Sequence, residues 1–342
     1  MNGNWNGKVN PKKRDHSSNH GTRKSHPISP KDNYQIKSFM VAKQTVSFLT
    51  KRFREVGLEP DSRHGQNFLI DMNLLNLLVD SGNIESNDLV LEIGTGTGSL
   101  TSLMAPRAAH VITVEIDTHL HQLAREELEE FDNITMVQND ALRNKNNFSP
   151  IVLSTIKEKF ESIPNCRFKL VANLPYNVAT PIISNLLLTE ILPTSMTVTI
   201  QKELADRIVA VPRTKDYSAL SIWMQSLCDC RIVRVLGPSV FWPRPKVHSA
   251  IIHLEHSLEK RSRIHDVPFY HEFVRSLFFH RRKFLRSVVI SSFKGQLDKP
   301  DVDDVLDRLE LGPQTRAEEL PVERILELSE GMRLKLQEVE SR

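Results

Sequence analysis

Four consecutive residues near the middle of the chain, Asn173, Leu174, Pro175 and Tyr176, could carry out chemistry on an amino group of a flat base. The exocyclic amino group of adenine is a poor nucleophile because its lone pair is delocalised into the ring, so hydrogen-bond acceptors must position it. The Asn173 side-chain carbonyl and the Leu174 backbone carbonyl, whose direction the rigid Pro175 sets, are such acceptors. Tyr176 offers a flat face for a base removed from its stack.

Transfer of a one-carbon group to such a nitrogen needs alignment more than a strong base, because the nitrogen can lose its proton after the new bond forms. Alignment of reacting groups lowers a barrier by about 7–11 kcal/mol at best. An Asn–Pro turn that ends a strand, with a buried tyrosine, is the structural alternative for this tetrad taken alone. The tetrad alone does not distinguish these two interpretations, so the other motifs of the chain must decide between them.

A glycine-rich turn follows an apolar segment in Leu89–Gly98, which reads LVLEIGTGTG. Glycines let the backbone approach a nucleotide-type cofactor, although a tight structural turn also explains them. The spacing G-x-G-x-G differs from the G-x-G-x-x-G of dinucleotide sites. Glu115 lies about twenty residues further on, where a carboxylate can accept hydrogen bonds from both hydroxyls of a ribose. Asp140 ends the next expected strand, where an acid meets an adenine amino group or only caps a helix.

Alternating strands and helices are expected to bring these residues to one edge of a sheet. Apolar runs predict the strands, and apolar spacings of three and four predict the helices. This order is typical of an α/β fold with a parallel, doubly wound sheet, whose strands present their carboxyl ends along one edge. The expected strands are 89–93, 111–116, 134–137, 168–171 and 196–200, and the expected helices are 100–105, 119–130 and 181–188.

The chain is expected to divide into three parts. Residues 1–38 are polar and basic without apolar periodicity, typical of a disordered tail that stays solvated or settles onto RNA phosphates. Residues 39–256 form the sheet domain, and residues 257–342 form a small helical domain because the alternation stops. The helices expected in that last part are 270–291, 300–308 and 322–336.

Positive charge is unevenly distributed, although the formal net charge is only +3. Residues 1–34 hold seven of the 45 basic residues but two of the 42 acidic ones, which leaves 38 basic and 40 acidic residues elsewhere. Attraction to phosphate must therefore come from local clusters. Arg275, Arg282 and Arg286 would share one stripe of the helix over 270–291, and this stripe either contacts RNA phosphates or faces solvent.

Composition excludes several classes of protein. Of 342 residues, 39% are hydrophobic and 25% are charged, as in ordinary soluble globular proteins. The three cysteines lack the spacing of a zinc site or a disulfide framework, and we expect no metal site. Neither a secretory signal nor an apolar run long enough to span a membrane is present. We expect a cytoplasmic protein that acts as a monomer, away from membranes.

A series of motifs is similar to those of the ribosomal RNA adenine dimethyltransferases. The similarity extends from about Gln44 to near the C-terminus, and the joint match is far more specific than any one motif. Thr95 and Thr97 depart from it, because the family often has Pro and Leu there. In chain order the motifs are GQNFLID from Gly65, EIGTGTGSLT from Glu92, VEID from Val114, NDAL from Asn139, NLPYNVATP from Asn173, QKELADRIVA from Gln201, KDYSALS from Lys215, FWPRPKVHSA from Phe241 and FFHRRKFLR from Phe278.

The resemblance implies a class I methyltransferase domain of Rossmann-like fold, with S-adenosyl-L-methionine as cofactor and a helical domain that helps to position RNA. It implies that the target adenine lies over Asn173–Tyr176 and receives two methyl groups on its N6 nitrogen. The implied substrate is two adjacent adenosines near the 3′ end of small-subunit (16S) ribosomal RNA, within the immature small subunit. The implied cofactor contacts are Asn67, Leu69, Gly94, Glu115, Asp140 and Asn173.

Three other functions compete with this one. A methyltransferase that acts on large-subunit RNA and confers antibiotic resistance shares the NLPY-type tetrad, but GQNFLID and NVATP favour the small-subunit enzyme. A nicotinamide-dependent dehydrogenase would share the sheet and Glu115 but needs another glycine spacing. An assembly factor that only binds RNA would be expected to lack Asn173 or Tyr176, and both are present.

Overall fold

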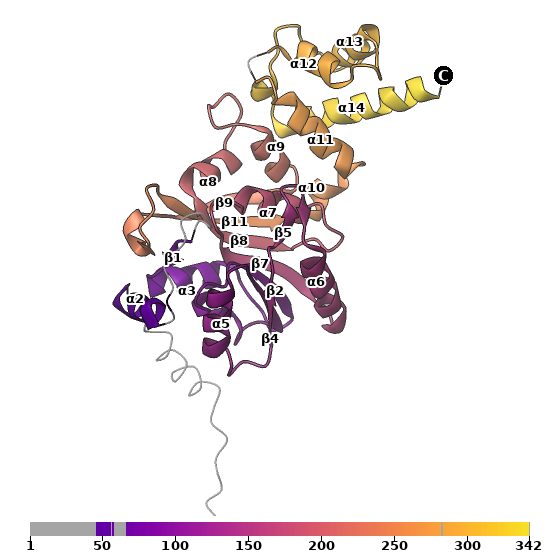
Figure 1. Cartoon of the computed structure of the whole chain (residues 1–342). Coiled ribbons are helices and arrows are strands. Elements are labelled where there is room, and N and C mark those ends of the chain that lie inside the picture. Colours follow the sequence, from indigo (N-terminus) through magenta and orange to yellow (C-terminus); the bar gives the residue numbers. More distant parts are fainter. Residues whose placement is uncertain (1–45, 56, 58–65, 282, 342) are drawn as a thin grey trace, which may run out of the picture. The chain divides into compact units, whose positions relative to one another are not determined.

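The computed structural model describes residues 46–55, 57, 66–281 and 283–341 (Figure 1). The tail that the sequence predicts over residues 1–38 lies outside the described residues. In the described part of the chain, seven strands form one sheet in the order β4, β3, β2, β7, β8, β11, β9. These strands are β2 (Asp88–Ile93), β3 (His110–Glu115), β4 (Ile134–Gln138), β7 (Arg167–Asn173), β8 (Ser195–Gln201), β9 (Cys228–Leu236) and β11 (Ser249–His256).

The sheet is parallel only in part, which corrects the prediction of a parallel sheet. Strands β4, β3, β2, β7 and β8 are parallel, whereas β11 runs antiparallel to both β8 and β9. The reason lies in the connection between β9 and β11, residues 237–248, which holds no α-helix that could carry the chain back to the other end of the sheet, so β11 runs antiparallel to β9. The five parallel strands still present their carboxyl ends at one edge, where the order reverses between β2 and β7.

Helices cover both faces of the sheet because apolar side chains recur on one side of each helix. On one face, α3 (Met72–Ser81) and α4 (Ser99–Met104) bury Leu78 and Met104 against Val90 and Val171. The opposite face is covered by α6 (Pro150–Ser162), α7 (Ala179–Leu186), α8 (Lys202–Ile208) and α9 (Ala219–Gln225). Helix α5 (Thr118–Glu127) follows β3. Helix α6 was not predicted, although Ser149 followed by Pro150 is a helix-start signal.

Short elements complete the sheet domain near the carboxyl edge. Strand β1 (Phe68–Leu69) pairs with β10 (Phe241–Trp242), which joins segments that are far apart in the sequence. Helix α2 (Val46–Glu55) packs Phe53 against Phe68 and Trp242. The small hairpin β5 (Leu142–Asn144) and β6 (Asn147–Phe148) follows β4, and η2 (Pro238–Val240) is a 3-10 turn before β10; a second 3-10 turn, η3 (Ala317–Glu319), lies in the helical part after residue 257.

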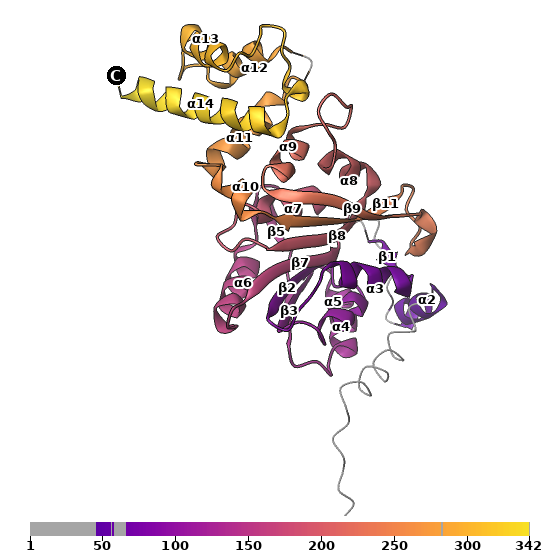
Figure 2. The same ribbon diagram turned by 180° about the vertical axis from the view of Figure 1, so that it is seen from behind.

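The chain after β11 is helical, and these helices lie beyond the β9 edge of the sheet (Figure 2). They are α10 (Leu258–Ser262), α11 (Val267–Leu277), α12 (Leu285–Ser292), α13 (Lys299–Arg308) and α14 (Val322–Glu340). The proposed boundary between residues 256 and 257 falls between β11 and α10. Hydrogen bonds join the two parts, because the Tyr270 hydroxyl lies 2.6 Å from that of Ser226 and the Tyr217 hydroxyl donates to the Leu320 carbonyl at 2.9 Å.

The single helix predicted over 270–291 is wrong, since α11 ends at Leu277 and α12 begins at Leu285. A turn interrupts the helix, with the Lys283 amide donating to the His280 carbonyl at 2.8 Å. The Arg281 side chain donates to the Thr214 and Lys215 carbonyls, which ties this segment to the loop between α8 and α9. Apolar spacing continues across the break, and tertiary contacts override it.

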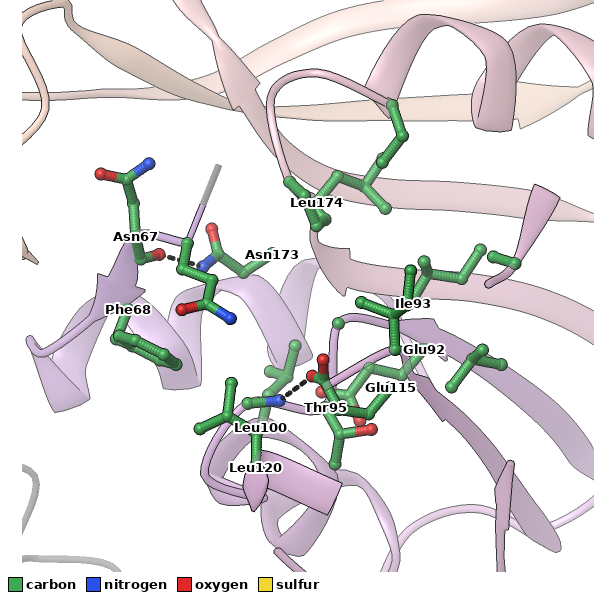
Figure 3. A pocket seen from close by; sticks show the side chains of 18 of the residues that line it. Asn67, Phe68, Glu92, Ile93, Thr95, Leu100, Glu115, Leu120, Asn173 and Leu174 are labelled. Carbon is green, nitrogen blue, oxygen red and sulfur yellow. Dashed lines mark hydrogen bonds between the residues drawn. The ribbon is translucent and has the colours of Figure 1, made fainter. Parts of the chain in front are cut away.

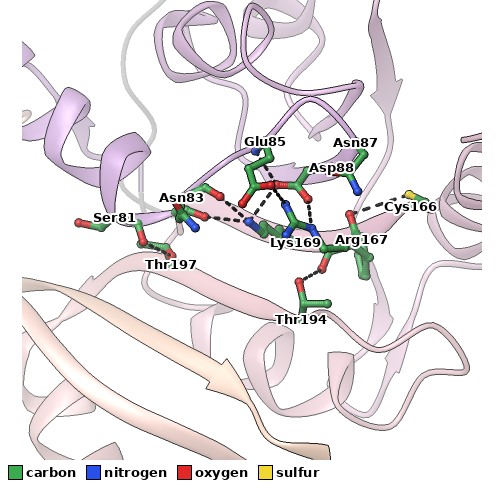
Figure 4. Close-up of polar contacts among 12 residues, drawn as sticks. Ser81, Asn83, Glu85, Asn87, Asp88, Cys166, Arg167, Lys169, Thr194 and Thr197 are labelled. Carbon is green, nitrogen blue, oxygen red and sulfur yellow. Dashed lines mark hydrogen bonds and ion pairs between the residues drawn. The ribbon is translucent and has the colours of Figure 1, made fainter. Parts of the chain in front are cut away.

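A buried ion cluster joins α3, β2 and β7 at the amino ends of the strands, away from the carboxyl edge (Figure 4). Asp88 is fully buried and accepts hydrogen bonds from Lys169 Nζ and Arg167 Nε, each at 2.8 Å. The ammonium of Lys169 also donates to the Asn83 carbonyl at 2.5 Å. The Lys169 side chain is itself buried. The Asp88 carboxylate is therefore the counter-ion of a lysine that has almost no access to water.

Asp88→Ala should destabilise the protein by about 3–5 kcal/mol, because it leaves the buried Lys169 charge without its counter-ion. Asp80→Ala is the matched control, since Asp80 pairs with Arg107 at an exposed position where an ion pair contributes about 0–1 kcal/mol. Urea unfolding of both variants measures the two effects. Equal losses for Asp80→Ala and Asp88→Ala would contradict the role given to the buried cluster.

Candidate active site

The glycine turn lies at the end of β2, between two other segments of the chain. Gly94 and Gly96 have φ of +89° and +56°, a backbone conformation that favours glycine. A Cβ on Gly94 would lie 3.4 Å from the Pro175 ring, and one on Gly96 would lie 3.0 Å from the Phe68 ring. The NLPY tetrad and β1 therefore pack directly against the glycine turn, and the contact with Phe68 leaves little room for a side chain at Gly96.

Two carboxylates end the strands beside that turn. Glu115 ends β3 and is buried, and its two oxygens accept from the Gly96 amide at 2.9 Å and the Asp117 amide at 3.0 Å. Burial raises the pKa of Glu115, while these backbone donors act to lower it. Asp140 follows β4, and its Oδ1 accepts from the Leu142 amide at 2.9 Å. The strand ends thus hold both acids in fixed positions.

The tetrad follows β7 on the same edge of the sheet. The side-chain amide of Asn173 donates from Nδ2 to the Asn67 carbonyl at 2.8 Å, so its Oδ1 is oriented as an acceptor (Figure 3). Leu174 is buried, and its backbone amide donates to the Thr199 carbonyl at 3.2 Å. These contacts fix the start of the tetrad on both sides, from β1 and from β8.

Tyr176 contacts β11, the strand that pairs antiparallel with β8. Its hydroxyl lies 2.5 Å from the Ser249 hydroxyl at the start of β11, and Ser249 is fully buried. Burial raises the pKa of Tyr176, so the phenol is neutral at physiological pH. The tyrosine is fixed in this way outside the lining of the cavity that the other three residues of the tetrad help to form.

One cavity of about 330 Å³ brings together most residues predicted for the site. Figure 3 shows Asn67 and Asn173 on one side of this cavity and Glu115 on the other. Phe68, Ile116 and Leu142 add apolar walls. The sequence-predicted residues in its lining are Asn67, Leu69, Gly94, Glu115, Asp140, Asn173, Leu174 and Pro175.

Glu92 is a polar residue of the site that sequence reasoning missed. It is fully buried in β2 below the glycine turn, and its Oε2 accepts from the hydroxyls of Thr101 at 2.5 Å and Thr113 at 2.6 Å. The Thr113 hydroxyl in turn lies 2.6 Å from that of Thr95 in the turn. Burial raises the pKa of Glu92 to about 8. An acid inside an otherwise apolar strand was the available signal.

Glu92→Gln should make stability less dependent on pH. The folded protein keeps Glu92 protonated up to about pH 8, whereas the unfolded chain loses this proton near the ordinary value of 4.5. Stability therefore falls as pH rises between those values, by about 1.36 kcal/mol per unit of pKa shift. Gln keeps the hydrogen-bond acceptor without the charge. As the pH rises from 5 to 9, the free energy of unfolding of the variant should therefore increase by a few kcal/mol relative to that of the wild type.

Thermal unfolding of the free protein at several pH values measures this difference. Glu129→Gln is the control, because it makes the same chemical change at an exposed position. Parallel profiles for the wild type and Glu92→Gln would show that Glu92 is ionised in the folded protein.

The continuous helix on which Arg275, Arg282 and Arg286 were expected to form one basic stripe is not present. Arg275 lies on α11 and Arg286 on α12, while Arg282 lies outside the described residues. Arg286 forms a bidentate pair with Asp303 on α13, at 2.6 and 2.8 Å, so its charge is already compensated. The spacing of seven and four residues places the three arginines on one stripe only if residues 270–291 form a continuous helix. Contact of these arginines with RNA stays a prediction without its original geometric basis.

The described residues offer neither a metal-binding cluster nor a membrane-spanning helix. Their His, Cys, Asp and Glu side chains form no group of three that could hold a metal ion. None of their helices is both long and apolar enough to cross a membrane.

The mixed seven-stranded sheet, with its cavity at the carboxyl ends of β2, β3, β4 and β7, has the arrangement of the class I methyltransferase fold. Residues 59–332 match the family described as Ribosomal RNA adenine dimethylase. The chain belongs to this family and is a ribosomal RNA adenine dimethyltransferase of class I fold, as the sequence motifs predicted.

Named relatives and solved structures agree with this assignment. A Ribosomal RNA small subunit methyltransferase A from Clostridium botulinum is 39% identical over 266 residues, which cover 78% of this chain and 91% of the relative. The protein of that name from Halothermothrix orenii is 34% identical over 83% of this chain and 92% of its own.

Two solved structures have a similar fold. A dimethyladenosine transferase from Plasmodium falciparum has a TM-score of 0.65 at 25% identity, covering 78% of this chain and 97% of its own. The 23S rRNA methyltransferase ErmE has a TM-score of 0.56 at 25% identity, covering 78% and 99%. The two structures therefore support the fold.

Proposed function

We propose that this protein transfers methyl groups from S-adenosyl-L-methionine to the N6 nitrogens of two adjacent adenosines near the 3′ end of small-subunit ribosomal RNA. The observation that carries the proposal is the cavity in which the glycine turn and Glu115 face the amide of Asn173. Relatives named for the small subunit share 34–39% identity with the chain over nine-tenths of their length.

The residues on one side of the cavity suit a nucleoside cofactor. The glycine turn leaves backbone where a side chain would block approach, and the Glu115 carboxylate can accept from ribose hydroxyls beside its backbone partners. Asp140 can accept from the adenine amino group, while Ile116, which is 47% exposed, offers an apolar surface for the ring. We infer that these residues bind S-adenosyl-L-methionine, which supplies an electrophilic methyl group on a sulfonium.

The residues on the other side suit an adenine amino group. Because Asn67 holds the Nδ2 of Asn173, the Oδ1 is directed as an acceptor, and the Leu174 carbonyl can provide a second one. Two acceptors on one amino group keep its lone pair pointed in the remaining direction, toward the cofactor side. A base in a duplex cannot reach this position, so the target nucleotide must leave its stack. The amine loses its proton to solvent after transfer.

The setting proposed for this reaction is the immature small ribosomal subunit in the cytoplasm, with the protein acting as a monomer. The helical part from residue 257 is proposed to help position the RNA. Action on large-subunit RNA is the less favoured alternative, because ErmE shares 25% identity with the chain against 39% for the small-subunit relative.

Tyr176→Phe and Ser249→Ala should each slow methyl transfer by only a few-fold, and the double variant should be no slower than either. Both changes remove the same hydrogen bond, and residues that share one interaction give non-additive effects. Tyr176→Ala should be slower than Tyr176→Phe, because the stacking face is lost as well. Single-turnover rates at limiting RNA test this order, with the exposed Ser287→Ala as control. Additive effects of the two changes would show that the Tyr176–Ser249 contact does not position the ring.

Primer extension on small-subunit RNA tests the proposed target in cells. Dimethylation of N6 removes the amino hydrogens needed for base pairing, so reverse transcriptase should stop at two adjacent adenosines near the 3′ end. Cells that lack the protein should lose both stops and regain them with the wild-type gene. Unchanged stops in those cells, or loss of stops in large-subunit RNA instead, would overturn the proposed substrate.

A further inference from the structure

Two loops that are far apart in the sequence are fastened together outside the cavity. Arg281, between α11 and α12, donates to the carbonyls of Lys215 at 2.5 Å and Thr214 at 2.9 Å, both between α8 and α9. The same guanidinium pairs with Glu318, whose carbonyl accepts from the Arg213 amide at 2.8 Å. Figures 1 and 2 both show these loops side by side, on the side of the molecule that carries β1.

The joined loops expose an aromatic ring beside positive charges. Phe279 is 73% exposed although it lies in a segment held by Arg281. Three side chains of these loops, Arg213, Lys215 and Lys283, are exposed cations. Among the residues that the structure describes, no acidic side chain pairs with any of the three. We call Phe279 with these three cations the double-loop surface.

Acids near this surface leave it positive. Glu318 is paired with Arg281, and the Glu319 carboxylate accepts from the Arg316 amide at 3.2 Å. Asp216 remains beside Lys215 as an acid with no ion pair among the described residues. The surface therefore carries an excess of positive charge. By contrast, Arg286 on α12 and Arg308 on α13 are paired with acids of α13.

We propose that the double-loop surface binds single-stranded RNA, with one base stacked on Phe279 and the neighbouring phosphates on Arg213, Lys215 and Lys283. An exposed ring on joined loops that also carry unpaired cations matches the two groups of a nucleotide strand, a flat apolar base and an anionic backbone. Arg281 is a positioning residue, because its guanidinium already binds Glu318 and two backbone carbonyls and so fixes the two loops relative to each other. This proposal rests on RNA being the substrate and adds a contact beyond the target base.

Phe279→Ala should weaken binding of protein-free, in vitro transcribed small-subunit RNA by roughly 5- to 150-fold, the range for loss of one stacked base. Phe279→Trp should restore it. The triple change Arg213→Ala, Lys215→Ala, Lys283→Ala should flatten the plot of log affinity against log salt by about 2, whereas Phe279→Ala should leave that slope unchanged. Leu258→Ala and Lys294→Ala are controls, because both residues are exposed elsewhere in the helical part.

Fluorescence anisotropy of labelled RNA, without cofactor, gives these affinities, and binding of S-adenosylmethionine by calorimetry should stay as in the wild type. Wild-type RNA affinity in Phe279→Ala overturns the proposal, even if the wild type dimethylates adenine. A loss of affinity confined to ribosomal particles that contain protein also overturns it, because the surface would then dock on a ribosomal protein. Weaker RNA binding in a protein that does not methylate adenine would keep the surface and refute only the proposed reaction.

Discussion

Asn173→Ala is expected to slow the chemical step of methyl transfer by roughly 10²–10³-fold, the cost of losing one positioned hydrogen bond in a transition state. The variant removes the Oδ1 acceptor that the contact with the Asn67 carbonyl orients. Binding of target RNA should change little, because the stacking surface of Tyr176 remains. The rate of a single turnover with labelled cofactor at saturating RNA separates this step from binding.

Calorimetric titration with S-adenosylmethionine is the control for that experiment, since Asn173 also lines the cofactor cavity. A variant that still binds the cofactor within a few-fold of the wild type, yet transfers methyl slowly, assigns Asn173 to the reaction. Full activity in a folded Asn173→Ala variant would refute the role of the tetrad in methylation of the adenine amino group.

Glu115→Ala should produce the largest loss of cofactor affinity, at least about 10²-fold, because two hydrogen bonds to a charged acceptor contribute about 1.5–3 kcal/mol each. Burial raises the pKa of Glu115, so this carboxylate takes up a proton at a higher pH than an ordinary glutamate does. Because protonation removes the acceptor, the affinity for S-adenosylmethionine should fall as the solution is made more acidic. Isothermal titration over a pH range measures both effects.

Glu130→Ala, at an exposed position, is the matched control for the Glu115 change. Unchanged affinity in a folded Glu115→Ala variant would remove this residue from the site. Tighter binding of NAD than of S-adenosylmethionine by the wild type would contradict the methyltransferase assignment altogether.

Local sequence patterns were sufficient to predict the five parallel strands of the sheet. Buried strands such as β2 are mostly apolar, with Glu92 as an exception in β2, and the glycine turn marks where β2 ends. Because parallel strands end at one edge, the sequence alone was enough to expect Gly94, Glu115 and Asn173 close together. The antiparallel direction of β11 was not predicted, because strand direction depends on the path of the connection and not on the strand itself.

Contacts between residues that are distant in the chain could not be predicted from the sequence. The partners of Asn173 and Tyr176 are 106 and 73 residues away, at Asn67 and Ser249. Resemblance to the family suggested Asn67 as a site residue but gave no hydrogen bond. The interruption between α11 and α12 has the same origin, since Arg281 bonds to a loop 66 residues earlier. Apolar periodicity reports which face of a helix is buried and carries little information on where tertiary contacts end it.

Nucleoside analysis of RNA after reaction tests the central claim most directly. Purified wild-type protein, labelled S-adenosylmethionine and immature small subunits are incubated, and the RNA is digested and separated. The proposed function predicts N6,N6-dimethyladenosine as the main product, with Asn173→Ala giving little of it in the same time. Methylated cytosine or methylated ribose as the main product, or dimethyladenosine formed on large-subunit RNA in preference to the small subunit, would contradict it.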